Sequence, residues 1–189
     1  MSTLHVENLK GLSSGGNANK IIVPSGQTID ASAGTLVPSA GQIVQTATHQ
    51  WKTVHTQTST SFSDVSGSSF TFTPKYATSK LVLTSFTEEN VYAAATSSYA
   101  GGHVRFMINT TTQADFTSGH NYQLYIEATG ATTINNHMRQ SKCIVVNATN
   151  TTARTIKLQC CTYGGQTTRL AVNYGDAYAS AITVQEIAA

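Results

Sequence analysis

The sequence predicts an all-β protein with two parts: an extended N-terminal arm or stalk over residues 1–45, and an antiparallel, jelly-roll-like β-sandwich over residues 46–189. Charged residues make up only 11% of the chain, against about 25% in typical soluble domains. Thr (30) and Ser (19) together fill 49 of the 189 positions, and β-branched Thr suits a half-buried pleated surface. From residue 46 onward, apolar and polar residues alternate in short runs between turn residues, which is the period of a strand.

The overall composition allows a folded core. Hydrophobic residues make up 40% of the chain and Pro only 3 residues, which is unlike a disordered tract. No stretch of ten residues shows a helical period, and charged helix faces are almost absent. We therefore exclude a helical bundle, a coiled coil and a typical α/β enzyme.

The N-terminal arm is rich in Gly, Ser, Ala and Asn and contains no aromatic residue. Residues 20–26 and 34–41 repeat one phrase, a short β-prone run that ends in Pro-Ser and a turn with Gly. Such thin segments cannot bury their aliphatic side chains alone, so we expect neighbouring chains to cover them; a loose tail is the alternative. The side chains expected between subunits are Ile21, Ile22, Val23, Ile29, Leu36 and Val37.

The sandwich is expected to consist of successive strands separated by Gly, Asn, Ser and Thr turns. The alternation is clear in residues 103–109, where Val104, Phe106 and Ile108 fall on one face. The pattern predicts antiparallel strands in two sheets. The expected strands are residues 69–73, 80–86, 103–109, 122–127, 142–147, 154–162, 170–174 and 181–187.

The three cysteines, Cys143, Cys160 and Cys161, do not suggest a disulfide framework. Their number is odd, and no CxxC pair is present to bind zinc. Cys160 alternates with Ile156 and Leu158, so we predict that it is a small buried hydrophobic residue.

Sequence motifs for catalysis or metal binding are absent. The chain has no phosphate-binding glycine loop, HExxH, GxSxG or dinucleotide fingerprint. Glu88 and Glu89 form the only acidic pair, and as neighbours they would diverge, which suits a solvated loop better than paired acid–base catalysis. The six His residues include no His-x-His pair. We expect no enzyme activity, no metal and no cofactor.

The charge pattern also narrows the class of partner. The net charge is +2, and Lys and Arg are scattered singly, so we expect no nucleic acid partner. The longest apolar stretches are far too short to span a bilayer, so we expect no membrane partner. Residues 1–7 lack the apolar core of a signal peptide, which predicts synthesis in the cytoplasm of the producing cell.

Five tyrosines fall in or beside Gly-rich connections and are candidate contacts to a glycan or another partner. Exposed aromatic rings can stack on sugar faces while neighbouring polar groups bind the hydroxyls. The alternative is that these rings fill the ends of the sandwich or a subunit interface. The five are Tyr92, Tyr99, Tyr163, Tyr174 and Tyr178.

Several segments together resemble a family of small β-sandwich modules in phage tail fibres and related virion proteins, common in marine and cyanobacterial phages. A Thr/Ser-rich strand leads to Phe-Thr-Phe-Thr-Pro and then to a Ser-Lys-hydrophobic phrase. Later segments are similar to the family's penultimate and closing strands, and an N-terminal phrase recurs in phage fibre proteins ahead of the sandwich. The matching segments are residues 22–29, 54–64, 70–74, 77–83, 155–159 and 180–187.

The resemblance implies a non-enzymatic, homotrimeric virion protein, made in the host cytoplasm: a short tail fibre. The arm would attach to the virion, and the sandwich heads would project outward toward other fibre components or a host surface glycan. The implied virion partners are a tail adaptor, a nozzle or other fibre subunits. Two alternatives stay open: a capsid decoration protein or head fibre on the major capsid protein, and a carbohydrate-binding module outside any virus.

Overall fold

The computed structural model describes residues 13–15, 25–26, 38–94, 99–113, 124–127, 133–163, 168–172 and 180–189. Contacts divide the chain into two units, Met1–Val37 and Pro38–Ala189, and every strand named below belongs to the second, here called the two-sheet unit. The aliphatic residues predicted to lie between subunits fall outside the described residues; they are Ile21, Ile22, Val23, Ile29, Leu36 and Val37.

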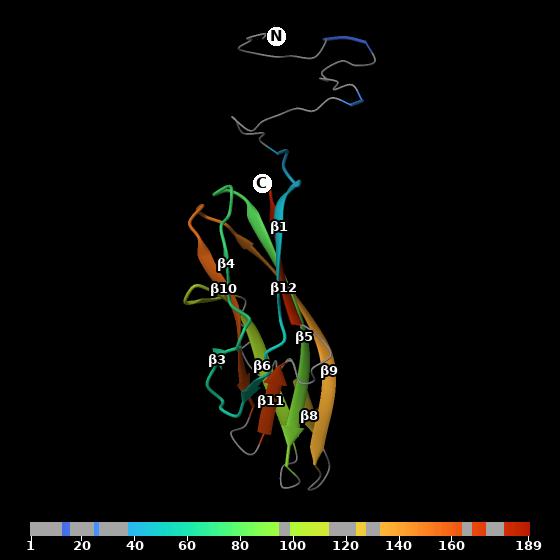
Figure 1. Cartoon of the computed structure of the whole chain (residues 1–189), viewed down its shortest axis with the longest axis vertical. Coiled ribbons are helices and arrows are strands. Elements are labelled where there is room, and N and C mark those ends of the chain that lie inside the picture. The colour runs from blue at the N-terminus through green and yellow to red at the C-terminus, as the bar shows by residue number, and fades with distance from the viewer. Residues whose placement is uncertain are drawn as a thin grey trace. The chain divides into compact units, whose positions relative to one another are not determined.

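The described part of the two-sheet unit is all-β and antiparallel, as predicted, and contains twelve strands and no helix (Figure 1). Thr, Val, Ile and aromatic residues are frequent in these strands, as expected for a pleated surface. The strands are β1 (Ile43–Trp51), β2 (His55–Gln57), β3 (Ser63–Asp64), β4 (Phe70–Phe72), β5 (Lys80–Ala93), β6 (Tyr99–Ile108), β7 (Thr111–Gln113), β8 (Leu124–Glu127), β9 (Ile134–Asn147), β10 (Arg154–Thr162), β11 (Thr168–Val172) and β12 (Ser180–Ile187).

The first sheet, here called sheet A, is organised around β5. Strand β9 pairs with β5 along its whole length, from Lys80 opposite Asn147 to Ala93 opposite Ile134. The other edge of β5 is shared, because β12 pairs with its first half and β11 with its second half. Strand β1 then pairs with β12, and β2 pairs with β11. At one end of sheet A the described strands therefore lie in the order β1-β12-β5-β9.

The second sheet, sheet B, is organised around β10 and β6. These strands pair from Ile156 opposite Ile108 to Thr162 opposite Gly102. The other edge of β10 is shared by β4 and β3, and the other edge of β6 by β7 and β8. The turn between β6 and β7 and the connection between β9 and β10 thus lie near the beginning of β10.

One hydrophobic core joins the two sheets. Leu81 and Leu83 of sheet A and Ile156 and Leu158 of sheet B belong to the same buried cluster. The predicted alternation in residues 154–162 is confirmed: even-numbered residues are buried, and residues 155, 157 and 159 are less so. Burying this apolar surface between the sheets is the main stabilising contribution to such a fold.

Cys160 is fully buried in this core, which confirms its prediction as a small hydrophobic residue. Burial, together with the negative charge of Glu89 and the neighbouring Cys161, raises the pKa of the Cys160 thiol from 9.0 to about 12. The thiol therefore stays protonated near neutral pH, and a thiolate is the form that would react or bind metal.

The expectation of a solvated loop at Glu88 and Glu89 is wrong, because both residues belong to β5. Their carboxylates do diverge, as predicted, since neighbouring residues in a strand point to opposite faces. Glu89 points into the interior, where it accepts hydrogen bonds from Thr87 Oγ1 (2.7 Å) and Lys142 Nζ (2.8 Å). A buried carboxylate is tolerated in a strand because this cation lies beside it.

The strand boundaries differ from the sequence expectation most clearly at β1, β5 and β9. Strand β1 begins at Ile43, inside the last residues of the predicted arm. Strands β5 and β9 are 14 residues each, so both extend well beyond the predicted ranges 80–86 and 142–147. The result is a long central ladder in sheet A.

Candidate functional site

The outer face of sheet A carries an uncharged surface where β1, β12, β5 and β9 lie side by side. Residues that pair directly across antiparallel strands point to the same face, so the strand register defines the rows of this surface. We call it the neutral face. Its three rows are Thr46-Gln185-Val82-Val145, Thr48-Thr183-Thr84-Cys143 and Gln50-Ala181-Phe86-Ser141.

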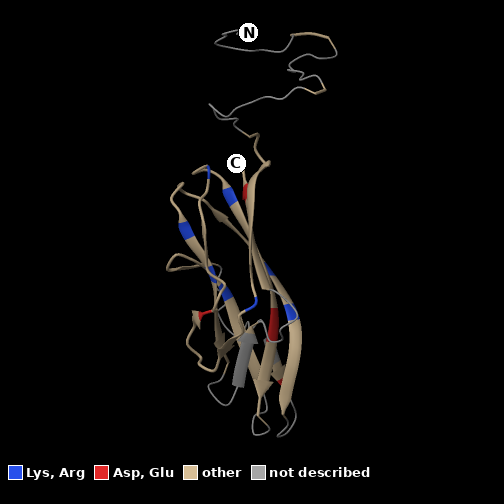
Figure 2. Ribbon diagram, in the orientation of Figure 1, with Lys and Arg blue, Asp and Glu red and all other residues tan. Residues whose placement is uncertain are grey.

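Side-chain contacts support this arrangement. The hydroxyl oxygens of Thr48 and Thr183 lie 3.1 Å apart, and Thr84 Oγ1 donates to Cys143 Sγ at 3.7 Å. Charged residues lie beyond the three rows. Lys80 is in the next row at one end, and Glu88 pairs with Arg139 in the next row at the other end. Figure 2 shows charged residues scattered along the described ribbon with long uncharged stretches between them.

Large hydrophobic side chains are exposed on and beside the neutral face. Phe86 is 42% exposed and Val145 is 59% exposed, and both belong to the face. Ile43, 56% exposed, pairs with Ile187 in the next row. Among the described residues, the remaining exposed large hydrophobic residue is Val54, outside the face. Single exposed apolar residues are ordinary, and Phe86, Val145 and Ile43 lie on different rows, so the absence of charge across three rows is what marks this face as a candidate interaction surface.

The outer face of sheet B is chemically different, because it carries a hydrogen-bonded network of charged groups. Lys157 Nζ and Gln159 Nε2 donate to the carboxylate of Asp64 at 2.6 and 2.8 Å. Arg105 donates to Gln159 Oε1 and lies 3.7 Å over the ring of Phe62. The Lys157 hydrogen bond is the main reason why the pKa of Asp64 is lowered. Covering this face would require desolvation of these charges, which the neutral face does not require.

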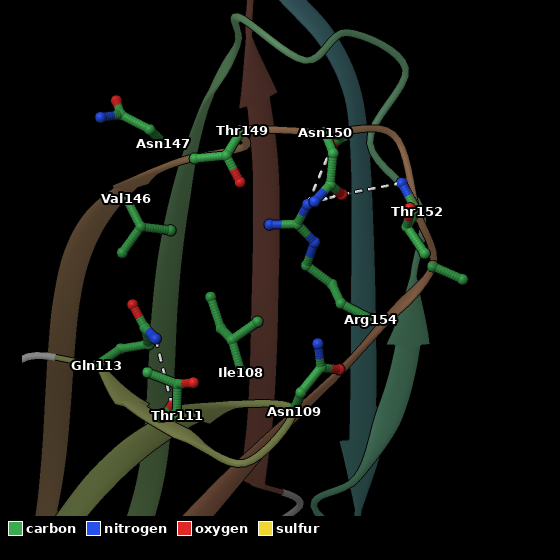
Figure 3. Close-up of a pocket in the computed structure, with 11 residues that line it drawn as sticks. Ile108, Asn109, Thr111, Gln113, Val146, Asn147, Thr149, Asn150, Thr152 and Arg154 are labelled. Carbon is green, nitrogen blue, oxygen red and sulfur yellow. Dashed lines mark hydrogen bonds between the residues drawn. The ribbon is translucent and has the colours of Figure 1, made fainter.

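A pocket lies at the end of the two-sheet unit where β6 and β9 stop and β10 begins (Figure 3). Its volume is about 410 Å³, within the range of about 300–1,000 Å³ for small-molecule sites. Its lining combines amides and hydroxyls with a small apolar part. The lining residues are Ile108, Asn109, Thr111, Gln113, Val146, Asn147, Thr149, Asn150, Thr152, Ala153 and Arg154.

Two residues of the pocket lining adopt the left-handed backbone region. Asn109 has a φ of 55°, which Asn tolerates, and its Oδ1 accepts from Thr155 N at 2.9 Å. Thr149 has a φ of 62°, which is unusual for a β-branched residue and costs about 1–3 kcal/mol of strain. The connection after β9 is therefore held in one specific conformation at the pocket.

Arg154 is the one charged residue in the pocket lining and is only 8% exposed. Its Nη2 donates to Ala148 O (2.6 Å), Asn150 O (3.0 Å) and Asn150 Oδ1 (2.9 Å). Burial lowers the pKa of the guanidinium, and the negative charge of Glu186 opposes this effect. The guanidinium thus fixes the β9–β10 connection and brings a positive charge to the pocket.

Three of the predicted tyrosine contacts are described, and they lie away from this pocket. Tyr92 is near the end of β5, Tyr99 begins β6, and Tyr163 follows β10, where its N–H donates to Gly101 O at 3.0 Å. These three positions gather at the opposite end of the strands from Ile108 and Arg154. Tyr92 and Tyr163 are partly buried, and nothing is described of the Tyr99 side chain. Tyr174 and Tyr178 lie outside the described residues.

Sequence reasoning did not single out the pocket. The Asn/Thr-rich stretches 109–113 and 147–152 read only as turns between strands. The available signal was that one such stretch, 147–152, comes just before Arg154, an isolated cation at the start of an alternating run. Nothing in the sequence linked the other stretch, 109–113, to it. Their convergence depends on the pairing of β6 with β10, which the sequence does not reveal.

Among the described residues, no cluster of three or more His, Cys, Asp or Glu side chains could hold a metal ion. In the same residues, no helix is long and apolar enough to cross a membrane. No protein-family model matches the chain, and no curated protein matches it.

Proposed function

We propose that this chain is a non-enzymatic phage virion protein: a short, trimeric tail fibre, made in the host cytoplasm, that attaches to the tail through its N-terminal arm. The two-sheet unit would be its jelly-roll-like head, and other virion proteins would be its partners at the arm. The observation that carries the assembly role is the neutral face, together with the resemblance to fibre modules.

The neutral face suits contact between identical subunits. In a symmetric oligomer every copy contributes the same residues, so a charge within the contact is repeated around the symmetry axis. The twelve side chains of the face carry no charge, and Phe86 and Val145 would leave water on association. Removing apolar surface from water contributes about 25 cal/mol per Å².

The neutral face alone is small for a stable interface. Strands lie about 4.8 Å apart and same-face residues about 6.7 Å apart, so the face covers about 400 Å². A standard interface buries about 800 Å² on each partner. In this proposal the arm supplies the remainder, through the aliphatic side chains Ile21, Ile22, Val23, Ile29, Leu36 and Val37.

A charge on the neutral face should weaken subunit association. We expect the full chain to sediment as a trimer, and Val145→Lys to shift it toward monomer at the same concentration. The Lys would place an ammonium group within the contact and leave it unpaired there. Because Val145 is 59% exposed, the fold should be affected by less than about 0.5 kcal/mol. Sedimentation velocity over a concentration series measures this shift.

The matched control is Val54→Lys, which changes an exposed valine outside the neutral face. It should sediment as the unsubstituted chain does. An unsubstituted chain that is monomeric at all concentrations would contradict the proposal. Equal sedimentation of the two variants would show that the neutral face is not the contact.

A further inference from the structure

Arg154 is a buried cation without an ion pair in the part of the chain that the structure describes. Its three hydrogen bonds all come from Nη2 and all go to carbonyl oxygens, those of the Ala148 and Asn150 backbones and the Asn150 side chain. Burying a guanidinium is costly unless an anion or several acceptors compensate its charge. The protein thus compensates the charge of the guanidinium only in part, and the N–H groups other than those of Nη2 have no acceptor among the described residues.

The unused part of the guanidinium faces the pocket. In Figure 3 the terminal nitrogen that is not bonded to Asn150 points into the space beside Val146, Ile108 and Thr149. Neither Nη1 nor Nε of Arg154 donates to an acceptor among the described residues. N–H donors of a desolvated guanidinium form their strongest hydrogen bonds with carboxylate or phosphate oxygens.

The charges around Arg154 favour a ligand with a single negative charge. Every other residue of the pocket lining is uncharged. Glu186 lies close enough for its charge to raise the pKa of Arg154, so part of the positive charge is already offset. The carboxylate of Glu186 is itself bound by Gln45, Ser79 and two backbone N–H groups. The positive charge that remains on Arg154 would therefore be matched better by one carboxylate than by a doubly charged phosphate.

The rest of the lining matches a sugar ring. Amide and hydroxyl groups, such as those of Asn109, Thr111 and Gln113, can both donate to and accept from sugar hydroxyls. Ile108 and Val146 provide an apolar part that can contact the C–H face of a ring. We propose that this pocket binds one carboxylated sugar unit, such as a hexuronic acid, with the carboxylate against Arg154 and the hydroxyls against the amide and hydroxyl walls.

This site goes beyond the assembly role and does not depend on it. The pocket lining and the neutral face share no residue, so binding at one can be tested while the other is intact. The site also differs from the described tyrosine positions predicted to contact a glycan, because Tyr92, Tyr99 and Tyr163 gather at the opposite end of the strands.

Methyl NMR of the full chain can test this site directly. Ile108 and Val146 both line the pocket and carry methyl groups, while Val54 serves as a remote reference. On titration with galacturonate, the Ile108 and Val146 signals should shift and saturate, and the Val54 signals should not. Galactose, which has the same ring without the carboxylate, should bind at least about tenfold more weakly, because a charge-assisted hydrogen bond is lost.

Two substitutions should identify the groups responsible. Arg154→Gln should weaken galacturonate binding at least about tenfold and bring its affinity close to that of galactose. Because Arg154 also holds the β9–β10 connection, a second variant, Gln113→Glu, places a carboxylate in the lining and leaves Arg154 in place. It should weaken galacturonate binding more than galactose binding, because only galacturonate carries a negative charge that the new carboxylate repels. Asn135→Asp, the same type of change far from the pocket, should have no effect on either ligand.

Other outcomes would overturn the inference. If galactose and galacturonate bound equally tightly, Arg154 would not be the charge partner of the galacturonate carboxylate. Inorganic phosphate that binds as tightly as galacturonate would indicate a general anion site rather than a sugar-acid site. Should Arg154→Gln fail to fold, an unchanged galacturonate affinity in Gln113→Glu would be decisive against the proposal. The absence of saturable Ile108 and Val146 shifts with galacturonate would also refute it.

Discussion

Replacing Glu186 with Ala is expected to lower the free energy of unfolding by about 4 kcal/mol or more, because several buried donors lose their acceptor. The carboxylate accepts from Gln45 Nε2 (2.6 Å), Ser79 Oγ (2.7 Å), Lys75 N (2.9 Å) and Tyr76 N (2.9 Å). An orphaned buried donor costs about 1–3 kcal/mol, and these costs are only partly additive. Glu186 thus ties β12 to β1 and to the segment before β5.

Urea denaturation of the full chain measures this loss. The single Trp of the chain, Trp51, is buried in the core and reports unfolding by fluorescence. Glu186→Gln is the matched variant: it keeps the shape and one acceptor oxygen, so its loss should be smaller than that of Glu186→Ala. A loss of less than about 1 kcal/mol in Glu186→Ala would contradict the assigned role of this carboxylate.

The same residue should give the stability a dependence on acid pH. Burial raises the pKa of Glu186, but hydrogen bonds from the Lys75 and Tyr76 amides, Ser79 and Gln45 outweigh it, and the net pKa is lower than the ordinary 4.5. A carboxyl group with a lowered folded-state pKa stabilises the fold above its unfolded-state pKa. This contribution is therefore complete above about pH 4.5 and declines as the pH falls through the folded-state pKa. Glu186→Gln should lack this part of the acid slope.

Replacing Lys142 with Met is expected to cost about 3–5 kcal/mol, because Glu89 would remain as a buried charge without its partner. The two side chains form an ion pair at 2.8 Å, and both are almost fully buried. Glu89 also accepts from Thr87 Oγ1, so the double variant Glu89→Gln/Lys142→Met removes both charges and keeps an acceptor for that hydroxyl. We expect the double variant to recover most of the lost stability.

A double-mutant cycle measured by urea denaturation separates the pair energy from other effects. The two single variants should each be less stable than the double variant. Independent, additive losses in the cycle would show that the two charges do not compensate each other. Such a result would leave the burial of Glu89 without a physical explanation.

The strands predicted most accurately from the sequence are those whose inward side chains are large and apolar. In β10, Ile156 and Leu158 alternate with Lys157 and Gln159, and the strand begins and ends where predicted. Strand β1 was not predicted as a strand because its inward residues include Gln45, Ala47 and His49, which do not form an apolar stripe. His49 instead fits in this strand because its ring stacks on that of Phe70, with the ring centroids 5.2 Å apart. Its Nε2 also lies within hydrogen-bond distance, 2.7 Å, of Gly67 O.

The second half of β5 was missed for a related reason. Glu88 and Glu89 were predicted to lie in a loop, because the partner that makes Glu89 acceptable in a strand is Lys142, 53 residues later. A long-range ion pair of this kind leaves no local signal. The predicted arm contacts lie outside the described residues and stay predictions.

The candidate surfaces were visible in the sequence only as composition. The abundance of Thr and Ser and the scarcity of charge indicated β structure but assigned no particular face. The neutral face itself depends on the register of four strands, and the pocket on three segments that meet at the end of the two sheets. Register is set by pairing across the sheet and cannot be read from one strand alone.

Quantitative mass spectrometry of purified phage particles decides whether this chain is a fibre subunit. Particles assembled with the full chain should contain it in a small multiple of three copies. Particles assembled with a chain that lacks residues 1–37 should contain none, although that chain keeps Gln45, its bond to Glu186 and the whole two-sheet unit. Absence of the full chain from particles, hundreds of copies as on a capsid lattice, or normal incorporation of the shortened chain would contradict the proposed function.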